Sequence, residues 1–272
     1  MYEEFYGFSA TPFTRGIPGR NLFLTPELSE VISRMEYVAK CHLFAVLTGD
    51  SGTGKTTILR RLNDQLDPRH YRMLYISDSK LTPRNFYRLL LEPLGVIAKR
   101  DRTEAKRQLH SQLTVMQAVD GVNTVCVVDE AHLLSFEMLE EIRFLLNVNF
   151  DSVSPVALIL AGQPELWKQR LSLQKCVAIR QRIDMNIVLR HLDRAETENY
   201  IASHLEYAGG RKDLFTDRAM DEIYKVSSGI PRMVNRVCEK ALMYASQQQK
   251  RLVDEHIVQF VSEHEMLKGG GE

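Results

Sequence analysis

The sequence predicts an α/β protein in which a parallel five-stranded sheet is followed by a smaller helical domain. Apolar runs of strand length alternate with helix-like segments up to about residue 191, which is typical of parallel sheets with crossover helices. A glycine-rich loop follows the first of these runs. Beyond residue 192 only amphipathic helix patterns remain, so a separate helical domain is expected there.

Strands that are buried on both faces of a parallel sheet read as continuous apolar runs rather than as alternating ones. The runs "LFAVLT" at 43–48 and "TVCVVD" at 124–129 read in this way. Further predicted strands are "RMLYIS", "VALILA" and "NIVLR", at residues 72–77, 156–161 and 186–190. We expect these segments to form the sheet in a βαβαβαβαβ order.

Helix starts are marked by capping residues and by proline at the first helical position, as at Thr25-Pro26 and Thr82-Pro83. Ser135 is the expected cap of a helix whose apolar stripe would face the core. The stripe consists of Met138, Leu139, Ile142, Leu145 and Leu146. Further helix patterns cover 56–66 and 104–119, and Asp193 with Glu196 predicts a capping box at the first of four C-terminal helices.

These elements predict how the chain is divided. We expect an N-terminal aromatic strap at 1–24, an α/β domain at 25–191, a small helical lid domain at 192–267 and a disordered tail at 268–272.

The overall charge excludes binding to a polyanion by bulk attraction. Lys+Arg and Asp+Glu both number 35, so the formal net charge is zero and any affinity for nucleic acid must come from local clustering. The four cysteines have no metal-site spacing, and we expect buried, reduced thiols. The start "MYEEFYGF" is unlike a signal peptide, and no apolar run approaches the roughly 18 residues of a membrane span, so we expect a cytoplasmic protein without membrane association.

The loop after the first strand, "GDSGTGKTT", fits the phosphate-binding pattern G-x-x-x-x-G-K-[ST]. Glycines let backbone N–H groups turn inward around phosphate oxygens, and the following helix adds the positive end of its dipole. Lys55 is expected to reach the β- and γ-phosphates, and Thr56 is expected to ligate Mg²⁺. The loop therefore predicts binding of a nucleotide, ATP, by Gly49, Asp50, Ser51, Gly52, Thr53, Gly54, Lys55, Thr56 and Thr57.

Two acidic residues end the third strand in "VCVVDEAH". Asp129 would lie at the carboxyl edge of a buried strand, where a carboxylate is placed to hold Mg²⁺ and its water shell. Glu130 is the natural group to orient or deprotonate the attacking water.

Two further polar positions complete a family pattern. Gln163 ends the fourth strand in "VALILAGQPEL", and "SGIPRMVNR" opens a C-terminal helix with Arg232. Together with the phosphate loop and the acidic strand end, these motifs resemble the AAA+ ATPases over about residues 1–265. The resemblance implies an AAA+ P-loop NTPase with a small helical lid, in which Gln163 is the sensor 1 residue and Arg232 the sensor 2 residue.

The same resemblance implies an arginine finger. AAA+ proteins place this arginine before the fifth strand, here within "AIRQRIDMNIVL". Arg182 matches the position best and Arg180 is the second choice; the alternative is a surface charge or an internal salt bridge. A guanidinium from a neighbouring subunit would neutralise charge developing on the γ-phosphate. Hydrolysis would then require a homo-oligomer, either a ring or a helical filament.

Within AAA+, the opening "MYEEFYGFSATPF" and the run "LILAGQPEL" are similar to the ExeA/GspA-type group. This group includes secretion and pilus-assembly ATPases, and its core is shared by transposition helpers of the Mu B, TnsC, TniB and IstB types. Secretion members typically continue into a membrane helix and a peptidoglycan-binding domain. Because this sequence shows neither, the expectation is a helper that oligomerises on double-stranded DNA and recruits or activates a transposase. A secretion or pilus ATPase acting without DNA, and a replication initiator or loader, remain alternatives.

The densest basic stretch spans residues 80–110. The residues expected to contact DNA phosphates, with little sequence preference, are Lys80, Arg84, Lys99, Arg100 and Arg102. A solvated helix face with internal ion pairs is the alternative. The N-terminal aromatic residues, Tyr2, Phe5, Tyr6, Phe8 and Phe13, likewise allow two interpretations, a strap packed on the core or a wall against adenine.

Overall fold

The structure is a computed structural model that describes residues 2–78, 80–146 and 154–266. Its contacts divide the chain into two compact units. The first, which we call the α/β unit, comprises Pro26–Ser51 and Lys55–Leu189. The second, the helical unit, comprises Met1–Thr25, Gly52–Gly54 and Arg190–Glu272. The N-terminal segment therefore groups with the C-terminal helices. The predicted tail at 268–272 lies outside the described residues.

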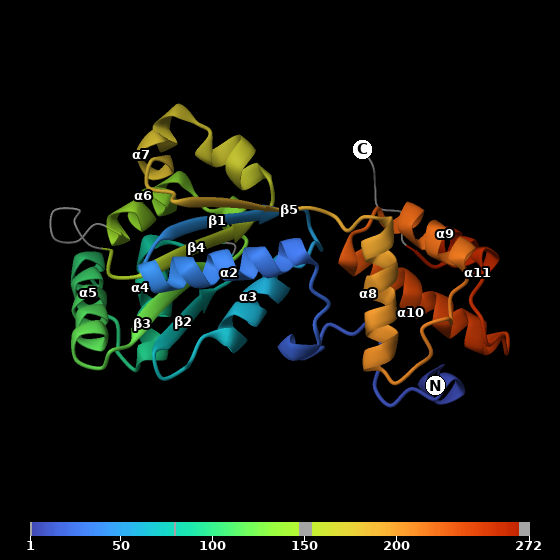
Figure 1. The fold of residues 1–272 in the computed structure, drawn as a ribbon. Helices are drawn as coiled ribbons and strands as arrows, with labels where there is room; N and C mark the ends of the chain where they lie inside the picture. Colours follow the sequence, from blue (N-terminus) through green and yellow to red (C-terminus); the bar gives the residue numbers. More distant parts are fainter. Residues whose placement is uncertain (1, 79, 147–153, 267–272) are drawn as a thin grey trace. The chain divides into compact units, whose positions relative to one another are not determined.

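The α/β unit contains a parallel sheet of five strands in the order β2-β3-β4-β1-β5 (Figure 1). The strands are β1 (Phe44–Gly49), β2 (Tyr71–Ile76), β3 (Asn123–Val128), β4 (Ala157–Gly162) and β5 (Met185–Leu189). All five predicted runs are thus strands, each displaced by one residue at most at either end. The parallel α/β fold class is confirmed.

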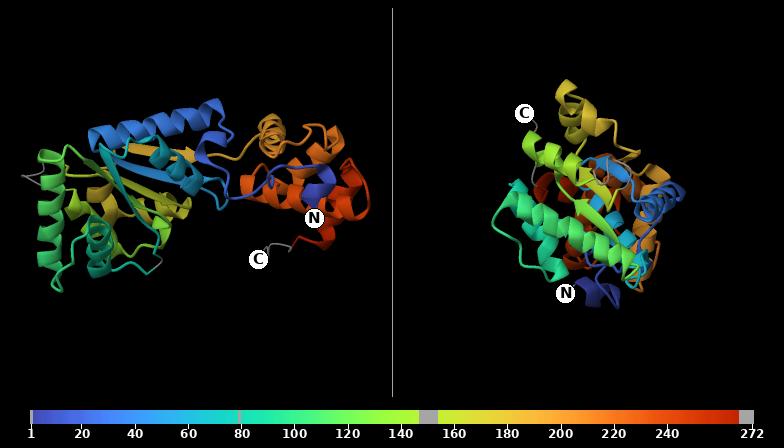
Figure 2. Two further views of the ribbon diagram at one scale, coloured as in Figure 1. Left: turned by 90° about the horizontal axis from the view of Figure 1, so that it is seen from below. Right: turned by 90° about the vertical axis from the view of Figure 1, so that its left-hand side faces the viewer.

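Helices cover both faces of this sheet. Helices α2 (Pro26–Cys41) and α3 (Lys55–Gln65) contact β1 and β4, and α2 runs along the sheet in the left view of Figure 2. The remaining helical segments of the unit follow β2, β3 and β4. They are α4 (Pro83–Leu91), η2 (Glu92–Leu94), α5 (Arg102–Ala118), η3 (Ala131–Leu133), α6 (Phe136–Leu145), η4 (Leu166–Leu171), η5 (Gln174–Cys176) and α7 (Val177–Arg180).

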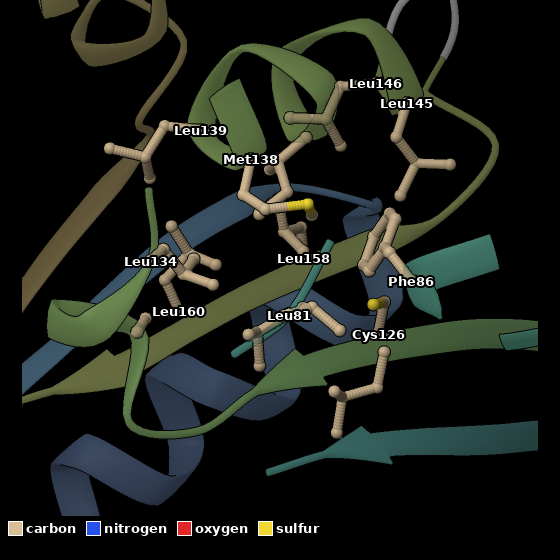
Figure 3. Close-up of a cluster of buried hydrophobic side chains, with 14 of the residues drawn as sticks. Leu81, Phe86, Cys126, Leu134, Met138, Leu139, Leu145, Leu146, Leu158 and Leu160 are labelled. Atoms are coloured by element: carbon tan, nitrogen blue, oxygen red, sulfur yellow. The ribbon is translucent and has the colours of Figure 1, made fainter. Parts of the chain in front are cut away.

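The predicted stripe of α6 lies in the main core of the α/β unit. All five of its apolar side chains are buried, and they pack with Phe86, Leu158 and Leu160 (Figure 3). Burying each of them from water contributes about 1.5–3 kcal/mol. The expected cap is present as well, because the Met138 N–H donates to Ser135 Oγ at 3.2 Å.

The helical unit consists of α8 (Arg194–Tyr207), α9 (Asp217–Ser227), α10 (Pro231–Gln247) and α11 (Glu255–His264), together with α1 (Tyr2–Tyr6) and η1 (Gly19–Asn21). The capping box of α8 is confirmed: Asp193 accepts from the Glu196 N–H, and the Glu196 side chain accepts from the Asp193 N–H. Tyr2 and Phe13 are buried in the core of this unit.

The expectation of buried thiols is wrong for one cysteine. Cys126, Cys176 and Cys238 are buried and free, but Cys41 is exposed at the end of α2. An amphipathic helix leaves part of its last turn in solvent, so sequence position alone did not decide its exposure. In the described part of the chain, no helix combines the length and apolar character needed to cross a bilayer.

Candidate nucleotide-binding site

The candidate site lies at the carboxyl edge of the sheet, where open α/β sheets bind their ligands. The order of the strands places β3, β4 and β1 side by side. The glycine-rich loop follows β1, Asp129 follows β3 and Gln163 follows β4. Three segments that are distant in the sequence therefore end at neighbouring positions.

The loop after β1 has the backbone that phosphate loops require. Gly52 and Gly54 have φ angles of 91° and 100°, which residues with a Cβ rarely adopt. Lys55 is the first residue of α3 and is buried, and its Nζ donates to the carbonyl oxygens of Gly49 at 2.6 Å and Asp50 at 2.9 Å. The lysine thus lies folded against the first residues of the loop. Ser51, Thr53 and Thr57 complete the segment; Thr53 is buried.

The loop and the acidic end of β3 are joined by one hydrogen bond. Thr56 Oγ1 donates to Asp129 Oδ2 at 2.9 Å, and Asp129 is buried. A hydroxyl and a buried carboxylate at hydrogen-bond distance are the oxygen ligands that Mg²⁺ prefers. The residues present therefore fit this ion.

Tyr75 is a residue of this edge that the sequence did not indicate. Its hydroxyl donates to Asp129 Oδ2 at 2.7 Å from the neighbouring strand β2. Partial burial, followed by the bond to Asp129, raises the pKa of Tyr75 to about 12, so the hydroxyl stays protonated at neutral pH. The only available signal was its position near the end of the strand beside β3.

Glu130 follows Asp129 in a left-handed backbone conformation, with φ 52° and ψ 31°. Its N–H donates to Asp129 Oδ1 at 2.8 Å, and its carboxylate is 47% exposed. The carboxylate is therefore accessible at the edge of the sheet, as a group that acts on water requires. Gln163 is half-buried at the end of β4.

The two candidate finger arginines lie at the end of α7 and just beyond it. The Arg180 guanidinium donates to the Leu171 carbonyl oxygen at 2.8 Å, within the α/β unit. Arg182 is half-buried just beyond α7. In the helical unit, Arg232 is exposed in the first turn of α10, directly after Pro231.

The five basic residues predicted to contact DNA are all exposed: Lys80, Arg84, Lys99, Arg100 and Arg102. They lie between the end of β2 and the start of α5. Arg102 also pairs with Glu141 of α6 at 3.3 Å. The loop before α5 is fixed by Gln108, whose side chain accepts from Lys99 N and donates to Ile97 O.

The parallel sheet, the phosphate loop after β1, the acidic pair after β3 and the C-terminal helices give this chain the fold of an AAA+ P-loop NTPase. A family model described as "AAA domain" matches residues 40–169. A curated relative, General secretion pathway protein A of Aeromonas hydrophila, is 30% identical over 247 residues. That match covers 90% of this chain but only 45% of the relative.

Solved structures share this fold. Cdc6p from Pyrobaculum aerophilum superposes with a TM-score of 0.72 at 16% identity, covering 95% of this chain and 71% of that chain. The Aeropyrum pernix ORC1 protein in complex with DNA superposes with a TM-score of 0.69 at 16% identity, covering 92% of this chain and 68% of that chain. The Thermotoga maritima RuvB Holliday junction branch migration motor superposes with a TM-score of 0.59 at 17% identity, covering 87% of this chain and 67% of that chain.

Proposed function

We propose that this chain is an ATPase whose nucleotide state switches an oligomer between assembled and released forms. The observation that carries the proposal is the 2.9 Å hydrogen bond between Thr56 and Asp129, because it joins the phosphate loop to the acidic end of β3. A loop alone would support nucleotide binding; the acidic end beside it supports hydrolysis.

The phosphates of ATP would be bound by the backbone N–H groups of residues 49–57 and by Lys55, whose Nζ would exchange its carbonyl partners for phosphate oxygens. Thr56 and Asp129 would hold Mg²⁺, which when bound neutralises negative charge on the phosphate oxygens. Tyr75 would keep the Asp129 carboxylate in one orientation through its 2.7 Å hydrogen bond.

Glu130 would orient the attacking water and accept its proton. By the resemblance to AAA+ proteins, Gln163 and Arg232 would contact the γ-phosphate from the same subunit. Arg182 would reach the nucleotide of a neighbouring copy. Loss of the γ-phosphate would remove these contacts and weaken the interface between subunits, which is the differential contact that a switch requires.

For the downstream partner, we propose a protein of a secretion or pilus-assembly system. The 30% identity to General secretion pathway protein A over 90% of this chain supports this role. Because ATP is the proposed substrate, we place the activity in the cytoplasm.

A second candidate is an oligomer on double-stranded DNA that recruits or activates a transposase. The specific observation in its favour is the exposure of all five candidate basic residues on the segment between β2 and α5. The fold is shared with a protein solved in complex with DNA, at 16% identity. The transposase itself is supported only by the resemblance seen in the sequence. A role as a replication initiator or loader is likewise supported only by the resemblance seen in the sequence.

Nucleotide binding and hydrolysis test the ATPase directly. We expect wild-type protein to bind a fluorescent ATP analogue with Mg²⁺ and to release phosphate, and Lys55→Ala to weaken binding by at least about 100-fold. Lys168→Ala removes an exposed lysine of the same unit and should change neither quantity. Binding by Lys55→Ala at wild-type affinity would exclude the proposed site.

Duplex DNA separates the two partner roles. If DNA is a partner, adding duplex should stimulate ATP hydrolysis. A plot of the logarithm of the DNA-binding constant against the logarithm of the salt concentration should have a slope smaller in magnitude by about 2 in the double variant Lys99→Ala/Arg100→Ala, roughly one per phosphate contact. The control Lys168→Ala/Arg170→Ala removes two other exposed cations. Hydrolysis unaffected by duplex at low salt would leave the secretion role and remove the DNA role.

A further inference from the structure

The turn after β3 lies unusually close to the end of β4. A Cβ on Gly162 would lie 3.0 Å from the backbone N of His132 and 3.5 Å from that of Ala131. The former separation is tighter than most side-chain carbons show, so a larger residue at 162 would require the turn to shift by a few tenths of an ångström. Gly162 directly precedes Gln163, and His132 lies two residues after Glu130. The glycine therefore brings together the turn that carries the proposed water-orienting carboxylate and the strand end that carries the proposed sensor.

One imidazole nitrogen lies between these two groups. His132 Nδ1 accepts from the backbone N–H of Gln163 at 3.4 Å and lies 3.5 Å from Glu130 Oε2. The His132 side chain is only 12% exposed, whereas that of Glu130 is 47% exposed. An imidazole held by its surroundings therefore lies against a carboxylate that has solvent on its other side.

We propose that His132 is a positioning residue: its Nδ1 accepts the Gln163 N–H and so fixes the turn that carries Glu130 relative to the end of β4. The inference rests on the proposed ATPase function and adds a residue to its mechanism. An Nδ1 that accepts from Gln163 carries no proton and donates nothing to Glu130. A change at Gln163 therefore reaches Glu130 through the backbone of the turn to which His132 and Glu130 both belong. His132 touches neither nucleotide nor water in this scheme and acts only by holding the turn after β3 against the end of β4.

Two amide side chains distinguish the two ring nitrogens. Asparagine places a polar atom as many bonds from Cα as Nδ1, and glutamine places one as far as Nε2. If Nδ1 is the functional atom, His132→Asn should preserve the link to Gln163, and His132→Gln and His132→Ala should lose it. A role limited to filling space would rank these variants by volume, with glutamine ahead of asparagine.

The first measurement needs neither nucleotide nor metal. In the free protein, the ¹H–¹⁵N resonance of the Gln163 amide should keep a hydrogen-bonded shift in wild type and His132→Asn and should move in His132→Gln. Little change in His132→Gln would overturn the inference, whatever the catalytic activity. His110→Ala is the matched control, because His110 is also half-buried in the α/β unit and its Nε2 has no hydrogen-bond partner.

The second measurement separates kcat from KM. We expect His132→Ala and His132→Gln to lower kcat for ATP hydrolysis about tenfold, with KM and ATP-analogue affinity within about twofold of wild type, and His132→Asn to stay within about threefold. Wild-type kcat in His132→Ala, or equal loss in the Asn and Gln variants, would contradict the inference. Should wild type bind ATP without hydrolysing it, the proposed ATPase fails, and the resonance of Gln163 still decides the role of His132.

Discussion

Glu130 combines an exposed carboxylate with a backbone conformation that costs a non-glycine residue about 1–2 kcal/mol. The N–H bond to Asp129 Oδ1 stabilises this conformation and ties the direction of Glu130 to the orientation of Asp129. Hence the proposed metal ligand and the proposed water-orienting group are not independent. A change that rotates Asp129 should also move Glu130.

Replacing Glu130 by glutamine removes the basic oxygen and keeps the size of the side chain. We expect Glu130→Gln to lower kcat by at least about 100-fold, the usual contribution of a general base, with ATP affinity within a few-fold of wild type. Phosphate release and analogue binding measure the two effects. Glu137→Gln, an exposed carboxylate in the first turn of α6, is the control. Normal turnover by Glu130→Gln would refute its proposed role.

Gly229 is required for a different reason, in the motif before Arg232. It has a φ of 70°, and a Cβ there would overlap the carbonyl oxygen of Leu192. We expect Gly229→Ala to lower the free energy of unfolding by at least about 3 kcal/mol, measured with urea. Gly7 has a φ of 74° with open space around it, so Gly7→Ala should cost only about 1 kcal/mol. Equal costs would mean that the backbone angle alone matters.

At the level of elements, a buried carboxylate links three helices of the α/β unit. Glu141 of α6 accepts a short hydrogen bond from the buried Tyr87 hydroxyl of α4 and lies 3.3 Å from Arg102 and 3.9 Å from Lys106 of α5. Burial is the main cause that lowers the pKa of Lys106, opposed by the attraction of Glu141. The segment that carries the candidate DNA contacts is therefore anchored at its α5 end.

Replacing Glu141 tests how much this carboxylate contributes to the free energy of unfolding. Glu141→Ala leaves the buried Tyr87 hydroxyl without its acceptor and removes the contacts of Arg102 and Lys106 with Glu141, and we expect it to reduce the free energy of unfolding by about 3 kcal/mol. Glu140→Ala breaks only a half-buried i,i+3 pair with Arg143 and should cost at most about 1 kcal/mol. Urea denaturation of both variants provides the comparison. A Glu141→Ala cost no larger than that of Glu140→Ala would show that the link contributes little.

Elements were predictable where the signal is local. Strand-length segments rich in apolar residues predicted all five strands, and the caps at Thr82, Ser135 and Asp193 accept the expected backbone N–H groups. The π-helix at Leu166–Leu171 and the short helix at Tyr2–Tyr6 were not predicted, since neither has a cap or a full apolar period.

The site was predictable only in part, because only some of its residues belong to local sequence motifs. The phosphate loop and Asp129 belong to motifs contiguous in the sequence. Tyr75 and His132 depend on which strands are neighbours and on how closely a glycine lets two turns approach. Strand order and the approach of two turns are set by the folded sheet, so no spacing of residues in the sequence predicts these two positions.

At the scale of the whole molecule, the proposed finger makes each site depend on two subunits. Lys55→Ala would lack nucleotide, and Arg182→Ala would lack the finger, so each alone should hydrolyse poorly. Mixed in equal amounts, they should recover on the order of a quarter of the wild-type rate, the chance of a complementary neighbour in a head-to-tail assembly. Phosphate release from the mixture is the measurement. Arg180→Ala in place of Arg182→Ala tests the second-choice arginine, and no recovery with either would contradict a shared site.

The helical unit should be sensitive to acid through one histidine. His204 Nδ1 accepts from the Phe13 N–H at 3.2 Å, and burial lowers the pKa of His204 to about 4. The unfolded chain takes up this proton near pH 6.5 and the folded chain only near pH 4, so stability is lost as the pH falls between these values. The expected loss is about 2 kcal/mol at pH 5 and about 3 kcal/mol at pH 4.

Urea unfolding at pH 7 and pH 5 tests this pH dependence. His204→Asn keeps an acceptor near the Phe13 N–H but does not titrate, so its stability should change less between the two pH values than that of wild type. An identical pH dependence in both proteins would assign the acid sensitivity to other groups.

Two residues of the N-terminal segment complete the core of the helical unit. Tyr2 and Phe13 are buried with Ile201, Phe215 and Val258. During synthesis this segment leaves the ribosome long before its partners exist, and its aromatic side chains stay unpacked until the residues around Val258 have emerged. Closing so long a loop is slow, and exposed apolar surface favours aggregation meanwhile. Cells that make this protein therefore have reason to shield residues 2–13 until the stretch around Val258 has been translated.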